Sequence, residues 1–416
     1  MCPTGDVWSE HGLIRVPFHK EPWYCYRLWE SISQAGSSCD YIDESIIIKG
    51  TKNKGKLQYG PMSYNALILC NMRSIEAETA LSIKKYVEEG GKLVVIDGYP
   101  YRSLSLNNNE DNDKLVKDVF TELSEKYTAS VIEIPGPADP EILLSWTIEM
   151  LNSSLIEPDL EIKDPDKNLF QIRHNDGKKD IWFFVNSNRA RSVNTEVRFP
   201  TGRKIPWKWD PENGTKEPFS FTKSPDELTI ALEPLQSLLL VFEPEDTESS
   251  QEPELSMETD TVMTITGPWI AEFNHIKGIS FNRSFDKLND FGTSEDVELN
   301  SFAGTVNYKT IFESDGTGKF LIIDKENKGV TGVYVNGRNA GTCWYGKPHF
   351  RIDSLIYKGE NTLEIRYTSV LSNYVRTLKN NPAALRWTTG YDKIPLGPEG
   401  TVTILSSKSV TINDKR

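Results

Sequence analysis

The chain has 416 residues, more than one ordinary hydrophobic core organises, so we expect roughly two to three domains. It carries 47 basic and 60 acidic side chains, and the resulting net charge of -13 argues against binding to a phosphate backbone. No stretch approaches the ~20 apolar residues of a membrane span. We therefore expect neither nucleic acid nor a membrane as a partner, and a neutral ligand such as carbohydrate fits better.

Residues 1–155 alternate the patterns of buried strands and amphipathic helices. Ala66–Leu69 and Leu93–Ile96 are short apolar runs typical of buried parallel strands. Apolar residues at helical spacing in 115–123, and Asp139 followed by proline, predict two later helices. Because the links are short, the crossovers should be right-handed. The pattern predicts a three-layer, flavodoxin-like α/β domain.

A further helix is predicted between those two strands. Ser74 offers a capping side chain, and apolar residues recur at helical spacing from Ala77 to Val87. Gly90-Gly91 then ends the helix, because glycine adopts the left-handed conformation at little cost.

Helical periodicity disappears over residues 156–245. Alternating or apolar runs at Ile181–Val185, Thr195–Phe199, Thr229–Leu232 and Ser237–Phe242 predict short strands separated by turn residues. We interpret this region as a β-sandwich.

An acidic segment follows, and we assign residues 246–260 to a linker. The run from Glu243 to Asp260 has eight acidic residues and neither lysine nor arginine. Such a composition buries too little apolar surface to order itself.

Residues 261–416 predict a second all-β domain. Its first strand signals lie at Ile265–Trp269, Val306–Phe312 and Phe320–Ile323. The most informative part is 332–367, GVYVNGRNAGTCWYGKPHFRIDSLIYKGENTLEIRY, in which Asn-Gly and Gly-Glu-Asn turns separate alternating strands. This spacing indicates a β-sandwich of the jelly-roll type.

The order of these signals resembles the galactose-binding-like β-sandwich that glycoside hydrolase family 2 uses as its sugar-binding domain. The signals are Gly267-Pro268-Trp269, Leu288–Phe291, Phe302–Thr305, and the later VNG, GxxW and GEN motifs.

Nearly the whole chain is similar to the C-terminal, non-barrel region of glycoside hydrolase family 106, the α-L-rhamnosidases. The α/β part carries this resemblance at Tyr64–Cys70 and Glu88–Pro100. The middle part carries it at Ile181–Asn186, Trp209–Pro211 and Pro234–Phe242. The resemblance implies an amidotransferase-like α/β domain followed by two β-sandwiches.

The resemblance also implies where the chemistry lies. The family's catalytic (β/α)₈ barrel, with its carboxylate pair, is N-terminal to this region, so we carry over no catalytic residue. The family commonly has His-Arg where this chain has Arg173-His174, which leaves that pair without an assigned role. The family suggests a secreted or periplasmic bacterial protein. The first twelve residues show no signal-peptide pattern, so the sequence leaves the compartment open.

Cysteine chemistry offers a third hypothesis, an amidotransferase-like enzyme. Cys70 follows a buried strand, where class I glutamine amidotransferases place their nucleophile, but it has no flanking glycine to form the strained elbow. We favour a core thiol. The five cysteines are odd in number and lack CxxC spacing, which favours unpaired thiols.

We expect no cofactor and no transition-metal site. The five histidines are scattered without HxH or HExxH spacing, although a structural calcium held by Asp and carbonyl oxygens would leave no signature in sequence. With 60 acidic residues, sequence spacing cannot identify a hydrolytic carboxylate pair, and we assign none.

The candidate carbohydrate-binding residues are Trp344, Tyr345 and His349, in a loop between sandwich strands. Sugar rings stack their C–H faces on Trp and Tyr, while their hydroxyls take polar partners. The alternative for Trp344 is that its side chain fills the edge of the sandwich.

We therefore expect the accessory region of a family 106-like glycoside hydrolase acting in polysaccharide breakdown, with a carbohydrate ligand and the parent's catalytic barrel as partners. The alternatives are a stand-alone carbohydrate-binding protein and, less favoured, an amidotransferase-like enzyme.

Overall fold

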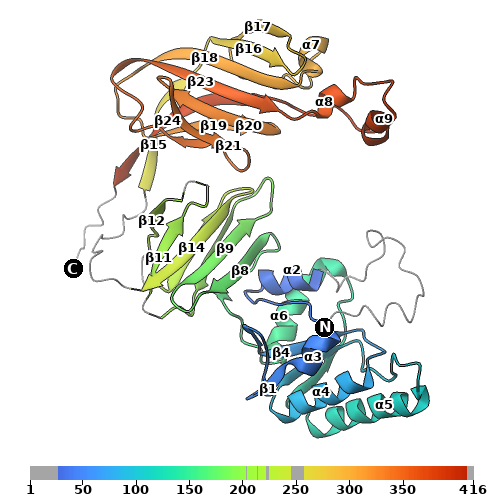
Figure 1. Ribbon diagram of the computed structural model, residues 1–416. Helices are drawn as coiled ribbons and strands as arrows, with labels where there is room; N and C mark the ends of the chain where they lie inside the picture. Colours follow the sequence, from blue (N-terminus) through green and yellow to red (C-terminus); the bar gives the residue numbers. More distant parts are fainter. Residues whose placement is uncertain (1–26, 203, 213, 222–223, 245–256, 410–416) are drawn as a thin grey trace, which may run out of the picture. The chain divides into compact units, whose positions relative to one another are not determined.

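The computed structural model describes residues 27–202, 204–212, 214–221, 224–244 and 257–409 (Figure 1). The chain divides into two compact units, residues 1–184 with 195–203, and residues 185–194 with 204–416. The fold mixes helices with several antiparallel sheets, as a multidomain α/β plus β-sandwich protein does. Most of the predicted acidic linker, residues 246–256, lies outside the described residues, and the predicted domain boundaries stay a prediction.

A parallel sheet forms the centre of the first unit. Its strands are β4 (Ala66–Cys70), β5 (Lys92–Ile96) and β6 (Val131–Ile134), in the order β4-β5-β6. The central strand β5 is apolar along its length because both of its faces are covered, and Leu93 to Ile96 are fully buried. The two predicted apolar runs are confirmed as neighbouring parallel strands.

Helices cover both faces of this sheet. Leu93 and Val95 pack with buried side chains of α4 (Ala77–Glu88) and α5 (Asn109–Lys126). Val94 and Ile96 pack instead with α2 (Arg27–Gln34) and α6 (Leu143–Ser153). Successive residues of one strand therefore face two different helix layers.

The start of α4 differs from the sequence prediction. Glu76, not Ser74, stands at the cap, and its own side chain makes no capping hydrogen bond. The cap comes from another helix, because the Glu44 carboxylate accepts from the Glu76 N–H at 3.0 Å and from the Thr79 hydroxyl at 2.6 Å. Ser74 instead accepts from the Arg102 side chain.

Short elements before β4 were not predicted. They are α3 (Glu44–Lys49) and an antiparallel sheet of β1 (Thr51–Asn53), β2 (Lys56–Tyr59) and β3 (Met62–Tyr64). A 3₁₀ turn, η2 (Pro140–Ile142), precedes α6, and Asp139 caps it as predicted by accepting from the Glu141 N–H.

The middle of the chain is all strand, as predicted. Its sheet orders are β13-β10-β7 and β12-β11-β14-β9-β8. The strands are β7 (Glu161–Ile162), β8 (Leu169–Asn175), β9 (Asp180–Asn186), β10 (Val193–Arg198), β11 (Lys204–Trp209), β12 (Lys216–Pro218), β13 (Glu227–Leu232) and β14 (Ser237–Pro244). Burial alternates along β9, where Trp182 and Phe184 are inside.

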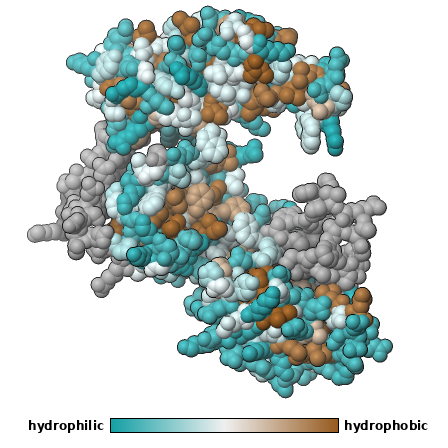
Figure 2. Space-filling view, in the orientation of Figure 1, coloured by the Kyte–Doolittle hydropathy of each residue, from teal (hydrophilic) through white to brown (hydrophobic). Residues whose placement is uncertain are grey.

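Two antiparallel sheets enclose one core in the C-terminal part of the second unit, in the orders β17-β16-β18-β23-β20-β21 and β15-β24-β19-β22. The strands are β15 (Met257–Ile265), β16 (Trp269–His275), β17 (Ser280–Phe285), β18 (Gly304–Ser314), β19 (Phe320–Glu326), β20 (Gly329–Val335), β21 (Arg338–Cys343), β22 (His349–Arg351), β23 (Gly359–Ser369) and β24 (Pro398–Ser409). Three short helices, α7 (Val297–Asn300), α8 (Ser372–Val375) and α9 (Pro382–Thr388), were not predicted. In Figure 2, hydrophobic side chains form separate patches on a mainly hydrophilic surface.

The VNG and GEN motifs form one hydrogen-bonded group, which we call the Asn336–Asn361 framework. Asn336 and Gly337 have φ of 52° and 74° and close the two-residue turn between β20 and β21. The Asn336 amide donates to Asn361 Oδ1 at 2.8 Å, and Asn361 donates to the Tyr357 and Gly359 carbonyls. The spacing of the two motifs therefore reflects hydrogen bonds that hold two turns together.

Candidate functional site: an exposed aromatic loop

The aromatic loop, residues 344–349, links β21 to β22 in the second unit. The Trp344 side chain is 62% exposed and that of Tyr345 is 39% exposed. Their ring centroids lie 4.6 Å apart at an interplanar angle of 67°. Trp344 therefore does not fill the edge of the sandwich, and both rings remain open to a ligand.

A contact from a distant turn orients the indole. Trp344 Nε1 donates to Glu212 Oε1 at 3.2 Å. Glu212 lies between β11 and β12, where its backbone N–H donates to Asp210 Oδ1 at 2.8 Å. With its polar edge held by a carboxylate, the indole keeps its apolar face free for stacking.

A charged pair lies beside the rings. Lys347 Nζ is 2.7 Å from Glu233 Oε2, and the Ser192 hydroxyl donates to the same oxygen at 2.9 Å. The hydrogen bond from Lys347 lowers the pKa of Glu233, so this carboxylate stays ionised at neutral pH. Glu233 can still accept from a ligand hydroxyl, since a carboxylate has about four acceptor positions.

His349 begins β22 and is exposed, whereas the next residue, Phe350, is buried. Neighbouring atoms desolvate the imidazole and lower its pKa, and the charge of Lys347 acts in the same direction while Glu233 opposes it. At neutral pH the ring is therefore neutral, with one donor and one acceptor nitrogen.

A carboxyl with an unusual pKa lies at the base of the loop. Burial raises the pKa of Glu326, at the end of β19, to about 7. Burial likewise raises the pKa of the Cys343 thiol to about 12, and that thiol contacts the Tyr345 carbonyl at 3.2 Å. Cys343 is therefore a protonated packing residue, while Glu326 changes charge near neutral pH.

Several of these contacts were not predicted. Glu212 and Glu233 contact the loop from turns more than 100 residues away in sequence, and Ser192 in turn contacts Glu233. Glu212 and Glu233 stand beside the Trp209–Pro211 and Pro234–Phe242 motifs, but neither motif indicated which residues they contact. Trp344 and Tyr345 lie in the loop, and His349 lies at the start of the strand that follows it, but the role of all three in binding stays a prediction.

Cys70 has the environment of a core residue. Its side chain is 4% exposed and packs in the cluster that contains Val94 and Met150. The left-handed conformation of an elbow occurs one residue later, at Asn71, with φ of 46°. The thiol is therefore not presented at the top of a strained turn.

The described residues bear on metal binding and on membrane insertion. Among them, no group of three or more His, Cys, Asp or Glu side chains is arranged to hold a metal ion. Within the same residues, the helices are too short or too polar to cross a bilayer.

Comparison with known proteins shows that the chain is similar to parts of sugar-cleaving enzymes. Residues 28–223 match the sequence model of glycoside hydrolase family 106, described as alpha-L-rhamnosidase. The chain is similar to glycoside hydrolase family 106. The structure of a rhamnosidase from Novosphingobium sp. PP1Y aligns with 89% of this chain and 36% of its own, with a TM-score of 0.68 and 20% identity. The two proteins therefore share a fold across nearly all of this chain.

A curated relative adds a second match. A putative beta-glucuronidase from Formosa agariphila is 27% identical over 240 residues, which cover 56% of this chain and 19% of the relative. With these matches, the chain is a glycoside hydrolase-like protein. It spans about a third of the rhamnosidase and a fifth of this relative.

Proposed function

We propose that this chain is the accessory, non-catalytic region of an α-L-rhamnosidase-like glycoside hydrolase that acts in polysaccharide breakdown. The observation that carries the proposal is the alignment of 89% of the chain with only 36% of a rhamnosidase at a TM-score of 0.68. That proportion is what an accessory region of a much longer enzyme would give.

The sheet topology of the chain supports the proposal that catalysis takes place in a separate barrel domain. In the described residues, β4, β5 and β6 form a parallel sheet of three strands. The strand pairs of the other sheets are antiparallel. A (β/α)₈ barrel needs eight parallel strands. In this proposal the carboxylates that cleave the glycosidic bond belong to a barrel outside the chain.

The aromatic loop supplies the proposed recognition chemistry. Trp344 and Tyr345 would stack on the C–H face of a sugar ring, while His349 and Glu233 would exchange hydrogen bonds with its hydroxyls. Exposed, tethered aromatic rings with a polar rim suit a neutral ligand rich in hydroxyl groups.

The finer fold assignments belong to the same proposal. The three covered strands of the first unit fit a flavodoxin- or amidotransferase-like scaffold whose catalytic thiol has been lost. The two sheets that enclose the last core fit a galactose-binding-like jelly roll.

A hydrolysis assay tests the proposal. The purified chain should release no 4-nitrophenol from 4-nitrophenyl α-L-rhamnoside above the buffer rate. Its sequence joined behind a family 106 barrel should support turnover. Enzymatic turnover by the chain alone, abolished by substituting one of its own carboxylates, would show that this region is catalytic.

The exposure of Trp344 also favours a second candidate, a stand-alone carbohydrate-binding protein. Both candidates predict sugar binding at the aromatic loop. They differ in one expectation. Only the accessory role predicts that a family 106 barrel loses activity when this region is removed from the enzyme.

A further inference from the structure

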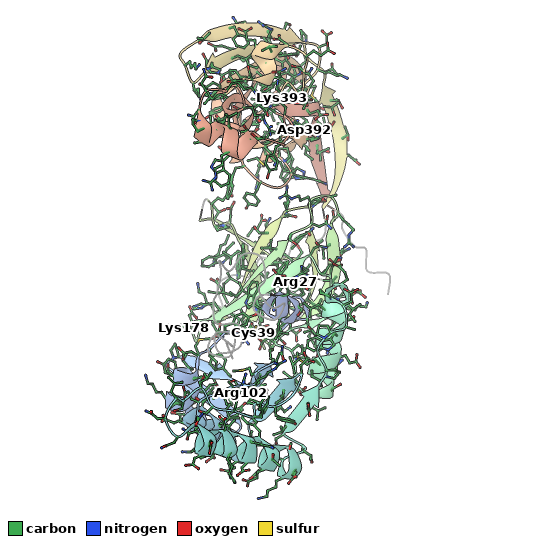
Figure 3. All side chains as sticks on the ribbon, turned by 90° about the vertical axis from the view of Figure 1, so that its right-hand side faces the viewer. Arg27, Cys39, Arg102, Lys178, Asp392 and Lys393 are labelled. Atoms are coloured by element: carbon green, nitrogen blue, oxygen red, sulfur yellow. The ribbon has the colours of Figure 1, made fainter. Side chains whose placement is uncertain are left out.

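The first unit contains a cavity of about 400 Å³, far in sequence from the aromatic loop. Its wall is built by α2, the segment after it, β3 and β4, the segment before β7, and β8. Figure 3 labels Cys39, one of the wall residues, and Arg27, where α2 begins. Cavities of this size hold small organic ligands.

A buried amide in this wall has an oxygen in need of a donor. Gln171 is 5% exposed, and its Nε2 donates to the carbonyls of Ser33 at 3.2 Å and Ser37 at 2.8 Å. These two acceptors fix which end of the amide is nitrogen. Gln171 Oε1 is left without a partner among the described residues.

A hydroxyl in the same wall is in a similar state. Ser37 is 7% exposed, and its Oγ also has no partner within the part of the chain that the structure describes. Buried polar atoms are rarely left unpaired, because they lose their hydrogen bonds to water and gain none in exchange. Arg173 Nε, in the same wall, is a third buried atom without a partner among the described residues. An amide oxygen, a hydroxyl and a guanidinium N–H lining one cavity indicate a polar occupant that both donates and accepts hydrogen bonds.

The charged groups of the cavity wall indicate which net charge a bound molecule can have. Asp40 accepts from the Tyr64 hydroxyl at 3.0 Å, and Asp159 and Glu157 also line the cavity. The guanidinium of Arg173 is already 2.8 Å from Asp180. Arg173 Nη1 also lies 3.9 Å from Asp159, so the guanidinium is already paired with carboxylates. The remaining excess of carboxylates in the wall disfavours an anion and favours a neutral molecule that both donates and accepts hydrogen bonds.

The remaining wall is apolar and partly aromatic. Trp29 is 41% exposed although it lies on the same short helix as the buried Leu28 and Ile32. All three line the cavity together with Leu67 and Ile68. A cavity lined by an indole and by oxygen acceptors matches a molecule with an apolar C–H face and a hydroxyl rim.

We propose that this cavity is a second carbohydrate site, which binds one or two rings of a neutral pyranose. The ring's C–H face lies on Trp29, and its hydroxyls donate to Gln171 Oε1 and the Asp40 carboxylate and pair with the Ser37 hydroxyl. The site does not depend on the aromatic loop or on a catalytic partner.

Isothermal titration calorimetry of the full chain tests this site with methyl glycosides of neutral hexoses and 6-deoxyhexoses, and with glucuronic acid as the anionic probe. We expect a neutral glycoside to bind and glucuronic acid to bind at least tenfold more weakly. Trp29→Ala and Asp40→Asn should each weaken binding about tenfold, and Ser37→Ala about fivefold.

Two controls separate this site from others. Trp387→Ala removes a 74% exposed indole of the second unit and should leave the affinity unchanged. All of these titrations use the Trp344→Ala/Tyr345→Ala double variant as the parent, so that the aromatic loop contributes no binding, and the cavity should still bind the neutral glycoside. The proposal is overturned if none of the neutral glycosides binds this parent, or if Trp29→Ala and Asp40→Asn bind as the parent does while remaining folded by circular dichroism.

Discussion

The Asn336–Asn361 framework and the aromatic loop lie in one 36-residue stretch, 332–367, yet they use their polar groups in opposite ways. Asn361 is fully buried, and its side chain accepts and donates only within the turns that it ties together. Trp344 is exposed and donates its hydrogen bond to Glu212 in a distant turn. The contrast separates residues that stabilise the sandwich from residues left available to a ligand.

Removing the framework should have the largest effect on stability. Asn361→Ala deletes a buried amide together with its hydrogen bonds to the Asn336 amide and to the backbone groups of Tyr357 and Gly359. We expect a loss of about 3 kcal/mol in the free energy of unfolding. Urea denaturation followed by circular dichroism measures it, with Asn339→Ala on exposed β21 as the control. A loss below about 1 kcal/mol would remove the distinction between framework and loop.

Glu326 should link stability to pH at the base of the loop. Its folded pKa is about 7, above the value of an unfolded glutamate, so the protonated form is favoured in the fold. This contribution is complete below the unfolded pKa and is lost as pH rises toward 7. Glu326→Gln should therefore stabilise the protein above pH 7 by about 1 kcal/mol, after allowance for partial exposure.

Thermal unfolding of the parent and Glu326→Gln at pH 4 and pH 8 measures this linkage. The difference between the two proteins should appear at pH 8 and shrink at pH 4. Equal differences at both values would mean that Glu326 is not held protonated by burial.

The turn glycine should contribute less than the framework. Gly337 has φ of 74°, and a Cβ built there meets no atom within 4 Å. The cost of Gly337→Ala is therefore backbone strain alone, about 1 kcal/mol. Chemical denaturation checks this value; a cost equal to that of Asn361→Ala would contradict a strain-only origin.

The charged pair beside the rings should matter least for stability. Lys347 and Glu233 are both substantially exposed, and such pairs contribute between zero and about 1 kcal/mol. Lys347→Ala should change the unfolding free energy by less than about 0.5 kcal/mol. Denaturation in low and in 1 M salt measures it, and a loss above 2 kcal/mol would place the pair among the structural residues.

Local pattern predicts the elements whose cause is local. The strands β4 and β5 are buried on both faces, which requires continuous apolar runs in the sequence. The Asn336-Gly337 turn needs two residues with positive φ, and this pair of residue types is recognisable in the sequence. Helix α2 was not predicted, because its eight residues carry only Leu28 and Ile32 as an apolar pair and bury Ser31, Ser33 and Gln34 beside them. Long-range contacts decide such elements.

The same limit applies to the candidate site. The aromatic loop could be predicted because Trp344 and Tyr345 stand between recognisable strands. Glu212 and Glu233, which contact Trp344 and Lys347, come from turns more than 100 residues away, and the motifs beside them do not indicate these long-range partners. The cap of α4 by Glu44 was missed for the same reason.

The central claim is that the exposed aromatic loop binds carbohydrate while the framework only supports it. Calorimetric titration with rhamnose-containing oligosaccharides, in a Trp29→Ala background that removes the proposed cavity site, compares the chain with Trp344→Ala and Tyr345→Ala and tests it most directly. We expect each variant to weaken binding about tenfold, or about 1.4 kcal/mol, with unchanged unfolding. Undiminished binding by the double variant would contradict the assignment of this loop.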